Sequence, residues 1–358
     1  MREITAEQLL LMKNAVPVDV RSPGEFEDSH IPGAINNPLF TNEERAEIGT
    51  LYKQQGSAAA KWRAMEIVSP KLPSILGKIR EIQKVGCQPV IYCWRGGMRS
   101  GSIATFLEFS GIEAVRLIGG YRAYRQYIIE QIPLLIPKQA VVLHGMTGTG
   151  KTDILKLLEK KGYPVLDLEK MAAHRGSLFG TLGLLNDGHN QKVFDSLLFE
   201  GLRKIKGSPY FIIEAESQRI GKVSQPEKLY ETKLEGYNLL LQASVDTRVK
   251  RIYREYVEPN KEQEWFHSTI IEKLLLLKKR FKNKDLHETM MDYAAQKQYD
   301  QVIRLLLENY YDPRYQYKQH EYKNAFIPIE ADDLEQAAEE IETYIEKAGY
   351  THKALTAE

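Results

Sequence analysis

Residues 140–152 read AVVLHGMTGTGKT, an apolar run that leads directly into a glycine-rich turn. Residues 145–152 fit the pattern G-x-x-x-x-G-K-[ST] and continue into the helical stretch TDILKLLEKKG, which is the order of a phosphate-binding loop. Backbone N–H groups of such a loop turn toward phosphate oxygens, and the helix N-terminus adds a favourable dipole. The predicted phosphate-binding residues are Gly145, Gly148, Thr149, Gly150, Lys151 and Thr152, with Thr152 also a magnesium ligand.

Three acids near predicted strand ends are candidates for a second carboxylate near that ion. Asp167 lies in YPVLDLE, and Glu214 and Glu216 lie in FIIEAE. Acids at strand ends also serve as helix caps or ion-pair partners, so both kinds of role stay open. NKDL at 283–286 does not satisfy the guanine-recognition pattern N-K-x-D, which argues against a guanine-nucleotide switch.

The chain as a whole predicts two α/β domains, because 358 residues exceed the usual size of one domain. PVDVRS, PVIYC and EAVRLIGG read as strands between helical stretches, as do YPVLDLE and PYFIIEAE further on, and this alternation is typical of parallel sheets. From about residue 246 the apolar pattern is helical. We predict a first domain over 1–133, a linker over 134–139, a phosphate-loop domain with a helical extension over 140–310, and a C-terminal tail and helix over 311–358.

Composition narrows the class of protein. Hydrophobic residues make up 43% and charged residues 27%, which is typical of globular chains, and the net charge of +1 neither favours nor excludes a nucleic acid. We see no apolar stretch long enough to span a bilayer, so we expect no membrane partner. The two cysteines, Cys87 and Cys93, lie at the two ends of one predicted strand, too far apart to pair. A cytoplasmic location is the simplest expectation.

Cys93 ends the predicted strand PVIYC and begins the turn CWRGGMRS. Arg99 follows after five intervening residues, and the backbone around Arg95, Gly96, Gly97 and Ser100 can curl so that its amides point at one centre. Such a ring, with Arg99 and a helix dipole, favours a thiolate nucleophile and would hold an oxyanion or a chalcogen anion. The alternative is a small buried hydrophobe, which is the reading that we prefer for Cys87.

Three blocks in the first 130 residues resemble the rhodanese superfamily: VDVRSPGEFEDSHIPGAINNPL, YCWRGGMRS and LIGGYRAYR. Sulfurtransferases of that superfamily often carry the arginine one position closer to the cysteine. The Cys-x5-Arg spacing here is that of cysteine phosphatases and enlarges the loop. A larger loop suits a tetrahedral phosphate-bearing donor such as selenophosphate.

Four further blocks are YKQQGSAAA at 52–60, HRGSLFG at 174–180, IIEAESQRIG at 212–221 and LLENYYDPRYQY at 306–317. With them, nearly the whole chain resembles the tRNA 2-selenouridine synthases. That resemblance implies a tRNA substrate with 2-thiouridine at the wobble position, S-geranylation from geranyl diphosphate, and then replacement of the geranylated sulfur by selenium from selenophosphate. It also implies that Cys93 carries selenium as a selanyl adduct, and a selenophosphate-producing enzyme is a candidate partner.

Basic residues are the candidates for contact with RNA. Lys278, Lys279 and Arg280 lie in a basic run, and a tyrosine-rich segment follows at 310–323, a combination that suits phosphate contacts and base stacking. His174 and Arg175 are candidates for contact with diphosphate or tRNA. A solvated helix face and a helix-capping turn are the respective alternatives.

Two other functions fit parts of the pattern. A cysteine phosphatase or sulfurtransferase fused to a small-molecule kinase would also use Cys-x5-Arg and a phosphate loop, without RNA. A non-enzymatic RNA-binding protein would have both sites vestigial, which the retained Cys93, Arg99, Lys151 and Thr152 argue against. The residues leave open whether the phosphate loop binds ATP, geranyl diphosphate or both.

Overall fold

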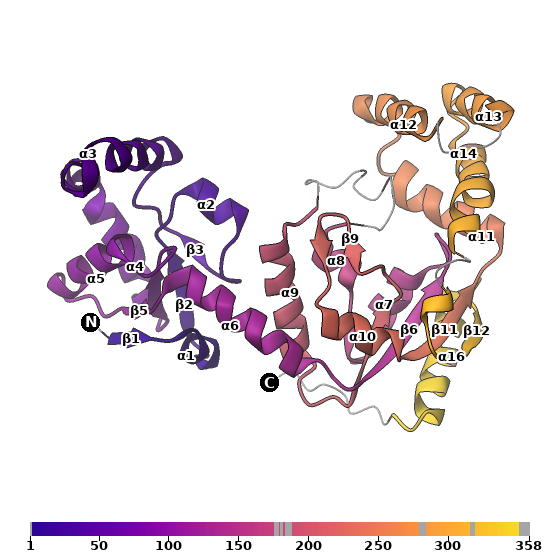
Figure 1. Cartoon of the computed structure of the whole chain (residues 1–358), viewed down its shortest axis with the longest axis horizontal. Coiled ribbons are helices and arrows are strands. Elements are labelled where there is room, and N and C mark those ends of the chain that lie inside the picture. Colours follow the sequence, from indigo (N-terminus) through magenta and orange to yellow (C-terminus); the bar gives the residue numbers. More distant parts are fainter. Residues whose placement is uncertain are drawn as a thin grey trace. The chain divides into compact units, whose positions relative to one another are not determined.

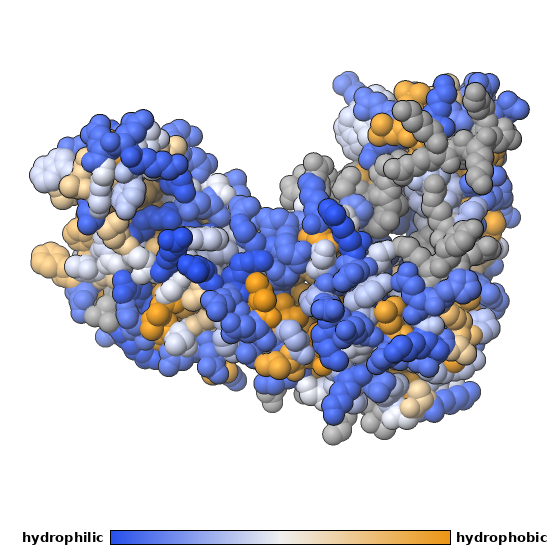
Figure 2. Space-filling model, viewed as in Figure 1, coloured by the Kyte–Doolittle hydropathy of each residue, from blue (hydrophilic) through white to orange (hydrophobic). Residues whose placement is uncertain are grey.

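The computed structural model describes residues 2–174, 179, 182, 188–278, 284–315 and 319–350, and it divides into two compact units (Figure 1). The first unit runs to Gln131 and takes in Asp195–Leu197, and the second contains the remainder of the chain. None of the helices in these described ranges is long and apolar enough to cross a membrane. On the face seen in Figure 2, hydrophilic residues predominate on both units.

The first unit is built on a parallel sheet, as the alternation of strands and helices predicts. Over the described residues the sheet has five strands in the order β1-β5-β4-β2-β3. The strands are β1 (Arg2–Ile4), β2 (Ala15–Asp19), β3 (Ile35–Asn36), β4 (Gln88–Tyr92) and β5 (Val115–Leu117). The helices are α1 (Ala6–Leu11), α2 (Pro23–Asp28), α3 (Asn42–Val68), α4 (Leu72–Lys84), α5 (Met98–Phe109) and α6 (Gly120–Leu135), with the short 3-10 helix η1 (Ser69–Lys71).

The block VDVRS contains a buried ion pair between Asp19 and Arg21. Arg21 and Asp19 are 1% and 0% exposed, and the guanidinium donates to the Asp19 carboxylate at 2.6 Å and to Ser29 O at 2.6 Å. Its carbon lies 4.6 Å from the ring centroid of Tyr121. Burial opposes the charge, but the hydrogen bonds and charge of Asp19 outweigh it and raise the pKa of Arg21. Removal of one partner would leave an uncompensated buried charge, so the pair ties β2 firmly to the residues around the cysteine turn.

The second unit has a second parallel sheet, which within its described part is five-stranded in the order β12-β11-β6-β8-β7. Its strands are β6 (Gln139–Gly145), β7 (Val165–Leu166), β8 (Tyr210–Glu214), β11 (Tyr237–Gln242) and β12 (Phe326–Glu330), and β9 (Arg219–Ile220) pairs with β10 (Val223–Ser224) as a small antiparallel ribbon. The helices near the sheet are α7 (Lys151–Lys160), α8 (Leu168–Ala172), α9 (Gln191–Lys204), α10 (Glu227–Leu234) and α16 (Leu334–Lys347).

A group of helices gathers at one end of this unit, where Figure 1 shows α12, α13 and α14 together, and has an apolar core of its own. The group comprises α11 (Val245–Ile252), the π-helical turn η2 (Tyr253–Val257), α12 (Glu264–Leu277), α13 (Lys284–Ala295), α14 (Tyr299–Leu306), the π-helical turn η4 (Leu307–Tyr311) and α15 (Asp312–Tyr315), followed by the 3-10 helix η5 (Gln319–Glu321). The strongly helical pattern predicted from about residue 246 is therefore confirmed. The α/β class predicted for both halves is also confirmed.

The structure differs from the expected organisation at two places. Helix α6 continues through Pro133 to Leu135 and β6 begins at Gln139, so only residues 136–138 of the predicted linker lie outside an element. The segment 311–358, predicted as a tail and helix, also contributes β12. This strand pairs with β11 along its whole length and can contain Pro328 because it is an edge strand, where a missing N–H is tolerated.

Candidate active sites

The phosphate loop joins the buried strand β6 to α7. Gly150 caps α7 with a φ of 93°, a left-handed conformation that favours glycine. Lys151 Nζ donates to Gly145 O at 2.7 Å, and Thr149 Oγ1 donates to Met146 O at 2.9 Å. The side chain of the lysine thus lies against the loop, with its charge beside the loop backbone.

Two arginines of α11 hold this loop from outside. Arg248, which is 3% exposed, donates from Nε to Thr147 O at 2.8 Å and binds both carboxylate oxygens of Asp312 at 2.6 and 3.0 Å. Arg251 donates to Thr149 O at 2.9 Å and to Ala331 O at 2.8 Å. The sequence analysis missed both residues. Their three-residue spacing in RVKR, which places them on one helix face, is the signal that could have found them.

A group of acids lies next to the loop. Thr152 Oγ1 donates to Glu169 Oε2 at 3.2 Å, and the backbone N–H of Glu169 donates to Glu214 Oε1 at 2.8 Å. The other carboxylate oxygen of Glu214 is buried and has no hydrogen-bond partner among the described residues. We call Asp167, Glu169 and Glu214 the acid cluster.

Burial, with neighbouring negative charges, raises the pKa of the acids in this cluster. Burial is the main reason that the pKa of Glu169 rises to about 8, and the charges of Glu216 and Asp167 raise it further. Burial also raises the pKa of Glu214 well above its ordinary value, with the charges of Asp167 and Glu169 adding to the effect. A cation bound here would favour the ionised forms.

The acid cluster and Thr152 supply oxygen ligands of the kind that magnesium prefers. An unpartnered carboxylate oxygen on Glu214 and an acid against the Thr152 hydroxyl fit such an ion. Across the described ranges, no group of three or more His, Cys, Asp or Glu residues is arranged to hold a metal by itself. Magnesium is usually bound by one or two carboxylates together with phosphate oxygens of the substrate.

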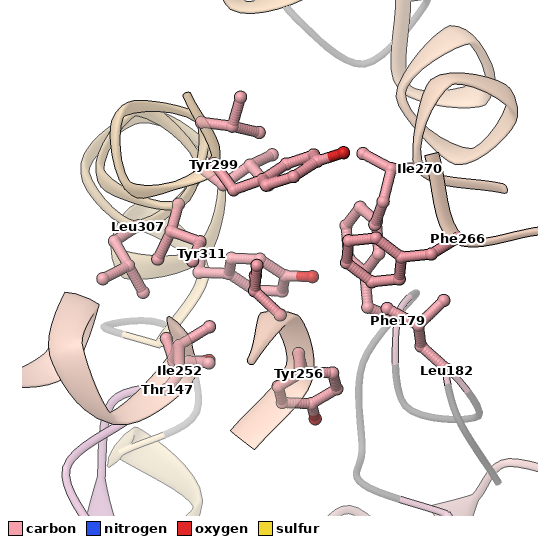
Figure 3. Close-up of a pocket in the computed structure, with 14 residues that line it drawn as sticks. Thr147, Phe179, Leu182, Ile252, Tyr256, Phe266, Ile270, Tyr299, Leu307 and Tyr311 are labelled. Atoms are coloured by element: carbon pink, nitrogen blue, oxygen red, sulfur yellow. The ribbon is translucent and has the colours of Figure 1, made fainter. Parts of the chain in front are cut away.

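An apolar pocket in the helical group reaches the phosphate loop (Figure 3). Its empty space is about 600 Å³, part of it open to solvent. Thr147 of the loop is in its wall, and the other lining residues come from α11, η2, α12, α14 and η4, together with Phe179 and Leu182. Tyrosine hydroxyls and Thr147 are the polar side-chain groups of this lining. A hydrocarbon chain is the ligand that such a wall suits.

The turns η2 and η4 are π-helical, and both contribute to the pocket, through Tyr256 and Val257 and through Leu307 and Tyr311. Short π-helical turns inside α-helices occur frequently at functional sites. Their position therefore makes the pocket a candidate functional site.

In the first unit, Cys93 follows β4 and is 3% exposed. Its Sγ lies 3.2 Å from the hydroxyl of Ser100, which is on the first turn of α5. The block LIGGYR packs against this turn, since the N–H groups of Tyr121 and Arg122 donate to Cys93 O and Trp94 O, each at 2.9 Å. A Cβ on Gly120 would overlap Cys93 O. The glycine pair thus sets the position of the cysteine backbone.

The loop arginines have different surroundings. Arg99 donates to both carboxylate oxygens of Glu25 at 2.6 and 3.2 Å, and Arg45 lies 3.8 Å from the same carboxylate. Burial opposes ionisation of Glu25, but the hydrogen bonds and charge of Arg99 outweigh it, so the pKa of Glu25 is lowered. Arg95 is exposed, and Gly97 caps α5.

Each unit matches the model of a protein family. Residues 5–127 match the rhodanese-like domain, and residues 138–348 match the model described as the tRNA 2-selenouridine synthase AAA domain. The chain belongs to the tRNA 2-selenouridine synthase family. Family membership makes it a transferase that acts in tRNA modification.

Curated members of the family are similar over most of the chain. The tRNA 2-selenouridine synthase of Pseudomonas syringae pv. syringae is 31% identical over 364 residues, which cover 94% of this chain and 97% of the relative. That of Hydrogenovibrio crunogenus is 32% identical and covers 86% of this chain and 90% of the relative. That of Bdellovibrio bacteriovorus is 36% identical over 273 residues, 72% of this chain and 69% of the relative.

The three acids that were predicted to lie near the magnesium ion have different surroundings in the structure. Asp167 caps α8 by accepting from Lys170 N at 2.8 Å, and burial raises the pKa of its carboxyl. Glu214 is in the acid cluster, and the direct role of Glu216 stays a prediction. Glu169, which contacts Thr152, was missed. Its position in the first turn after a strand and a capping Asp is the available signal.

The candidates for tRNA contact stay predictions. His174 lies against Gly221 of the β9–β10 ribbon, and burial lowers its pKa. Lys278 is exposed just after α12. Arg175, Lys279 and Arg280 lie outside the described residues.

Proposed function

We propose that this transferase converts 2-thiouridine at the tRNA wobble position to 2-selenouridine in two steps. It first moves a geranyl group from geranyl diphosphate to the sulfur of the base, and then replaces the geranylated sulfur with selenium from selenophosphate. The observation that carries the first step is the apolar pocket with Thr147 of the phosphate loop in its wall. A diphosphate ester with a hydrocarbon tail has the two chemistries that these adjoining sites offer.

The phosphate loop is the proposed site of the diphosphate. In the transfer, the C1–O bond breaks with its electron pair leaving on diphosphate, the sulfur supplies the pair for the new C–S bond, and the base loses its N3 proton. Negative charge therefore develops on the leaving group. The loop amides, the N-terminus of α7 and Lys151 stabilise that charge. Magnesium beside Thr152 and the acid cluster would neutralise part of it.

The pocket is the proposed site of the geranyl chain. Its rings include Phe179, Tyr256, Phe266, Tyr299 and Tyr311. Ring faces attract positive charge, so a ring near Thr147, such as Tyr256, would stabilise the partial cation that forms on the allylic carbon as diphosphate leaves. The apolar wall also excludes water that would hydrolyse the donor.

The cysteine loop is the proposed site of selenium transfer, and Cys93 is the residue proposed to act there. In the overall step the Se–P bond breaks and the phosphoryl group passes to water as phosphate, selenium forms a bond to C2 of the base, and the C2–S bond breaks with geranyl thiol as the leaving group. Arg99, held by Glu25, neutralises the phosphate of selenophosphate together with the loop amides. Alkylation makes the sulfur of the base a better leaving group, which gives the first step its purpose. We propose that Lys278 and His174 contact tRNA.

Nucleoside mass spectrometry of 2-thiouridine tRNA tests the division of labour. With geranyl diphosphate and magnesium we expect S-geranyl-2-thiouridine, and after addition of selenophosphate we expect 2-selenouridine. Cys93→Ala should stop selenium incorporation and leave S-geranylation intact. Cys87→Ala is the matched control and should keep both steps. Lys151→Ala should stop S-geranylation, with Lys156→Ala, an exposed lysine of α7, as its control.

An unchanged 2-thiouridine peak with the wild-type protein would overturn the proposal. Loss of S-geranylation in Cys93→Ala, or failure of Lys151→Ala to incorporate selenium into tRNA that already contains S-geranyl-2-thiouridine, would overturn the assignment of one step to each site.

A further inference from the structure

We propose that the ring pair of Phe266 and Tyr299 closes the pocket at the end opposite Thr147 and thereby sets the length of the prenyl chain that the enzyme accepts. In Figure 3, Thr147 lies at one end of the pocket, and Tyr299 and Ile270 lie at the other. The inference rests on the proposed function, because it takes a prenyl diphosphate as the ligand, with its diphosphate at the phosphate loop.

The ring pair is buried and held in place. Phe266 is 0% exposed and Tyr299 is 5% exposed, and their rings meet edge to face with centroids 5.3 Å apart. A hydrogen bond of 3.1 Å joins the Tyr299 hydroxyl to Nδ1 of His267. Trp265 also packs edge to face on Phe266, with centroids 5.9 Å apart. Movement of the Phe266 or Tyr299 ring would therefore break several of these contacts.

A closed end of this kind discriminates by length. The diphosphate fixes one end of the donor at the loop, so a chain that is one isoprene unit longer must push into Phe266 and Tyr299. Protein interiors are packed too closely to absorb such an extension. A shorter chain fits but leaves apolar wall uncovered. We therefore expect the enzyme to prefer geranyl over both farnesyl and dimethylallyl donors.

The test measures kcat/KM for S-prenylation of 2-thiouridine tRNA with dimethylallyl, geranyl and farnesyl diphosphate. Phe266→Ala should raise the ratio of farnesyl to geranyl by roughly 10–200-fold, the range of size discrimination in apolar pockets. Ile270→Phe should act in the opposite sense and favour dimethylallyl. Leu274→Ala is the matched control, because Leu274 is a fully buried residue of the same helix that does not line the pocket.

Two further outcomes separate the inference from the proposed function. If Phe266→Ala does not fold, Phe266→Leu should raise the same ratio by a smaller factor. A wild-type protein that uses no prenyl diphosphate would overturn the proposed function and this inference together. Normal geranylation with a ratio that is unchanged in the Phe266 variants, or that changes equally in Leu274→Ala, would overturn the inference alone.

Discussion

Replacement of Arg248 by Ala should destabilise the second unit by a predictable amount. The guanidinium is almost fully buried and makes two hydrogen bonds to Asp312 and one to Thr147 O. The substitution would leave the Asp312 carboxylate without its cation and the Thr147 carbonyl without its donor. The phosphate loop and the start of α15 would therefore lose their connection.

The cost follows from the burial of the pair. Removal of one partner from a buried ion pair costs about 3–5 kcal/mol, and we expect the lower end, because the Asp312 side chain keeps 21% of its exposure and water can reach it. A change of 1 kcal/mol shifts Tm by about 2–4 °C in a unit of this size, so a loss of about 3 kcal/mol lowers Tm by about 6–12 °C.

Tryptophan fluorescence can follow this unit alone. Trp265 is the only tryptophan of the second unit, so a Trp62→Phe, Trp94→Phe background reports its melting. Arg304→Ala is the matched control. It breaks an exposed pair with Asp246 that joins α14 to α11, and exposed pairs contribute little to stability, so its Tm should not change measurably.

A double-mutant cycle with Asp312→Ala completes the test. The double variant should be more stable than the sum of the single changes implies, because neither charge is then left alone. Melting of Arg248→Ala within about 2 °C of wild type, a shift too small for a buried pair, would refute the reasoning. Full additivity in the cycle would refute it as well.

Three other predictions concern the two sites. Gly120→Ala should abolish selenium incorporation and lower the Tm of the first unit, because its Cβ would overlap Cys93 O. Gly111→Ala, at a similar φ of 69° with nothing within 4 Å, should keep activity when nucleosides are measured by mass spectrometry. Glu169 has a pKa of about 8 in the folded chain and an ordinary value of 4.5, so the metal-free protein should lose stability as pH rises between these values. Glu169→Gln should remove up to about 1.4 kcal/mol per pH unit of that slope in urea unfolding with a chelator, and an unchanged slope would count against the assignment. Magnesium with inorganic diphosphate should raise the Tm of the wild-type protein more than that of Thr152→Val, and equal shifts would place the ion elsewhere.

The phosphate loop and the cysteine turn were predictable because each consists of consecutive residues. Residues 145–152 contain the whole phosphate loop, and the strand before it and the helix after it are strong local patterns. The cysteine turn is equally local. The partner that limits its position, Gly120, was recognised only as part of a family block, since no spacing indicates that it packs on Cys93 O.

The acid beside Thr152 was not predictable in the same way. Asp167 and Glu169 are two residues apart, and the turn into α8 decides which of them caps the helix and which one reaches the loop. Asp167 was one of three predicted candidates, with Glu214 and Glu216, and Glu169 was not among them. Tertiary structure gives the contact with Thr152 to Glu169 instead.

The apolar pocket and β12 depend on contacts between distant segments. Phe266 and Tyr299 read as ordinary core positions of two amphipathic helices, and nothing local shows that they face Thr147 across a pocket. The strand FIPIE was not predicted from the sequence, and the proline in its middle is a residue that local patterns place outside central strands. Its place at the edge of the sheet, beside β11, is what makes that proline acceptable.

The order of the second sheet has a consequence for synthesis of the protein. Strand β11 ends at Gln242 and β12 begins at Phe326, so ribosomes moving at about 5–20 residues per second need roughly 4–17 s to deliver the neighbour of β11. During that interval β11 is the outer strand of a growing sheet, with unpaired backbone groups that invite pairing with other nascent chains. The helical group is made within the same interval. A delay in synthesis between residues 242 and 326 would therefore lengthen the time for which this edge is exposed.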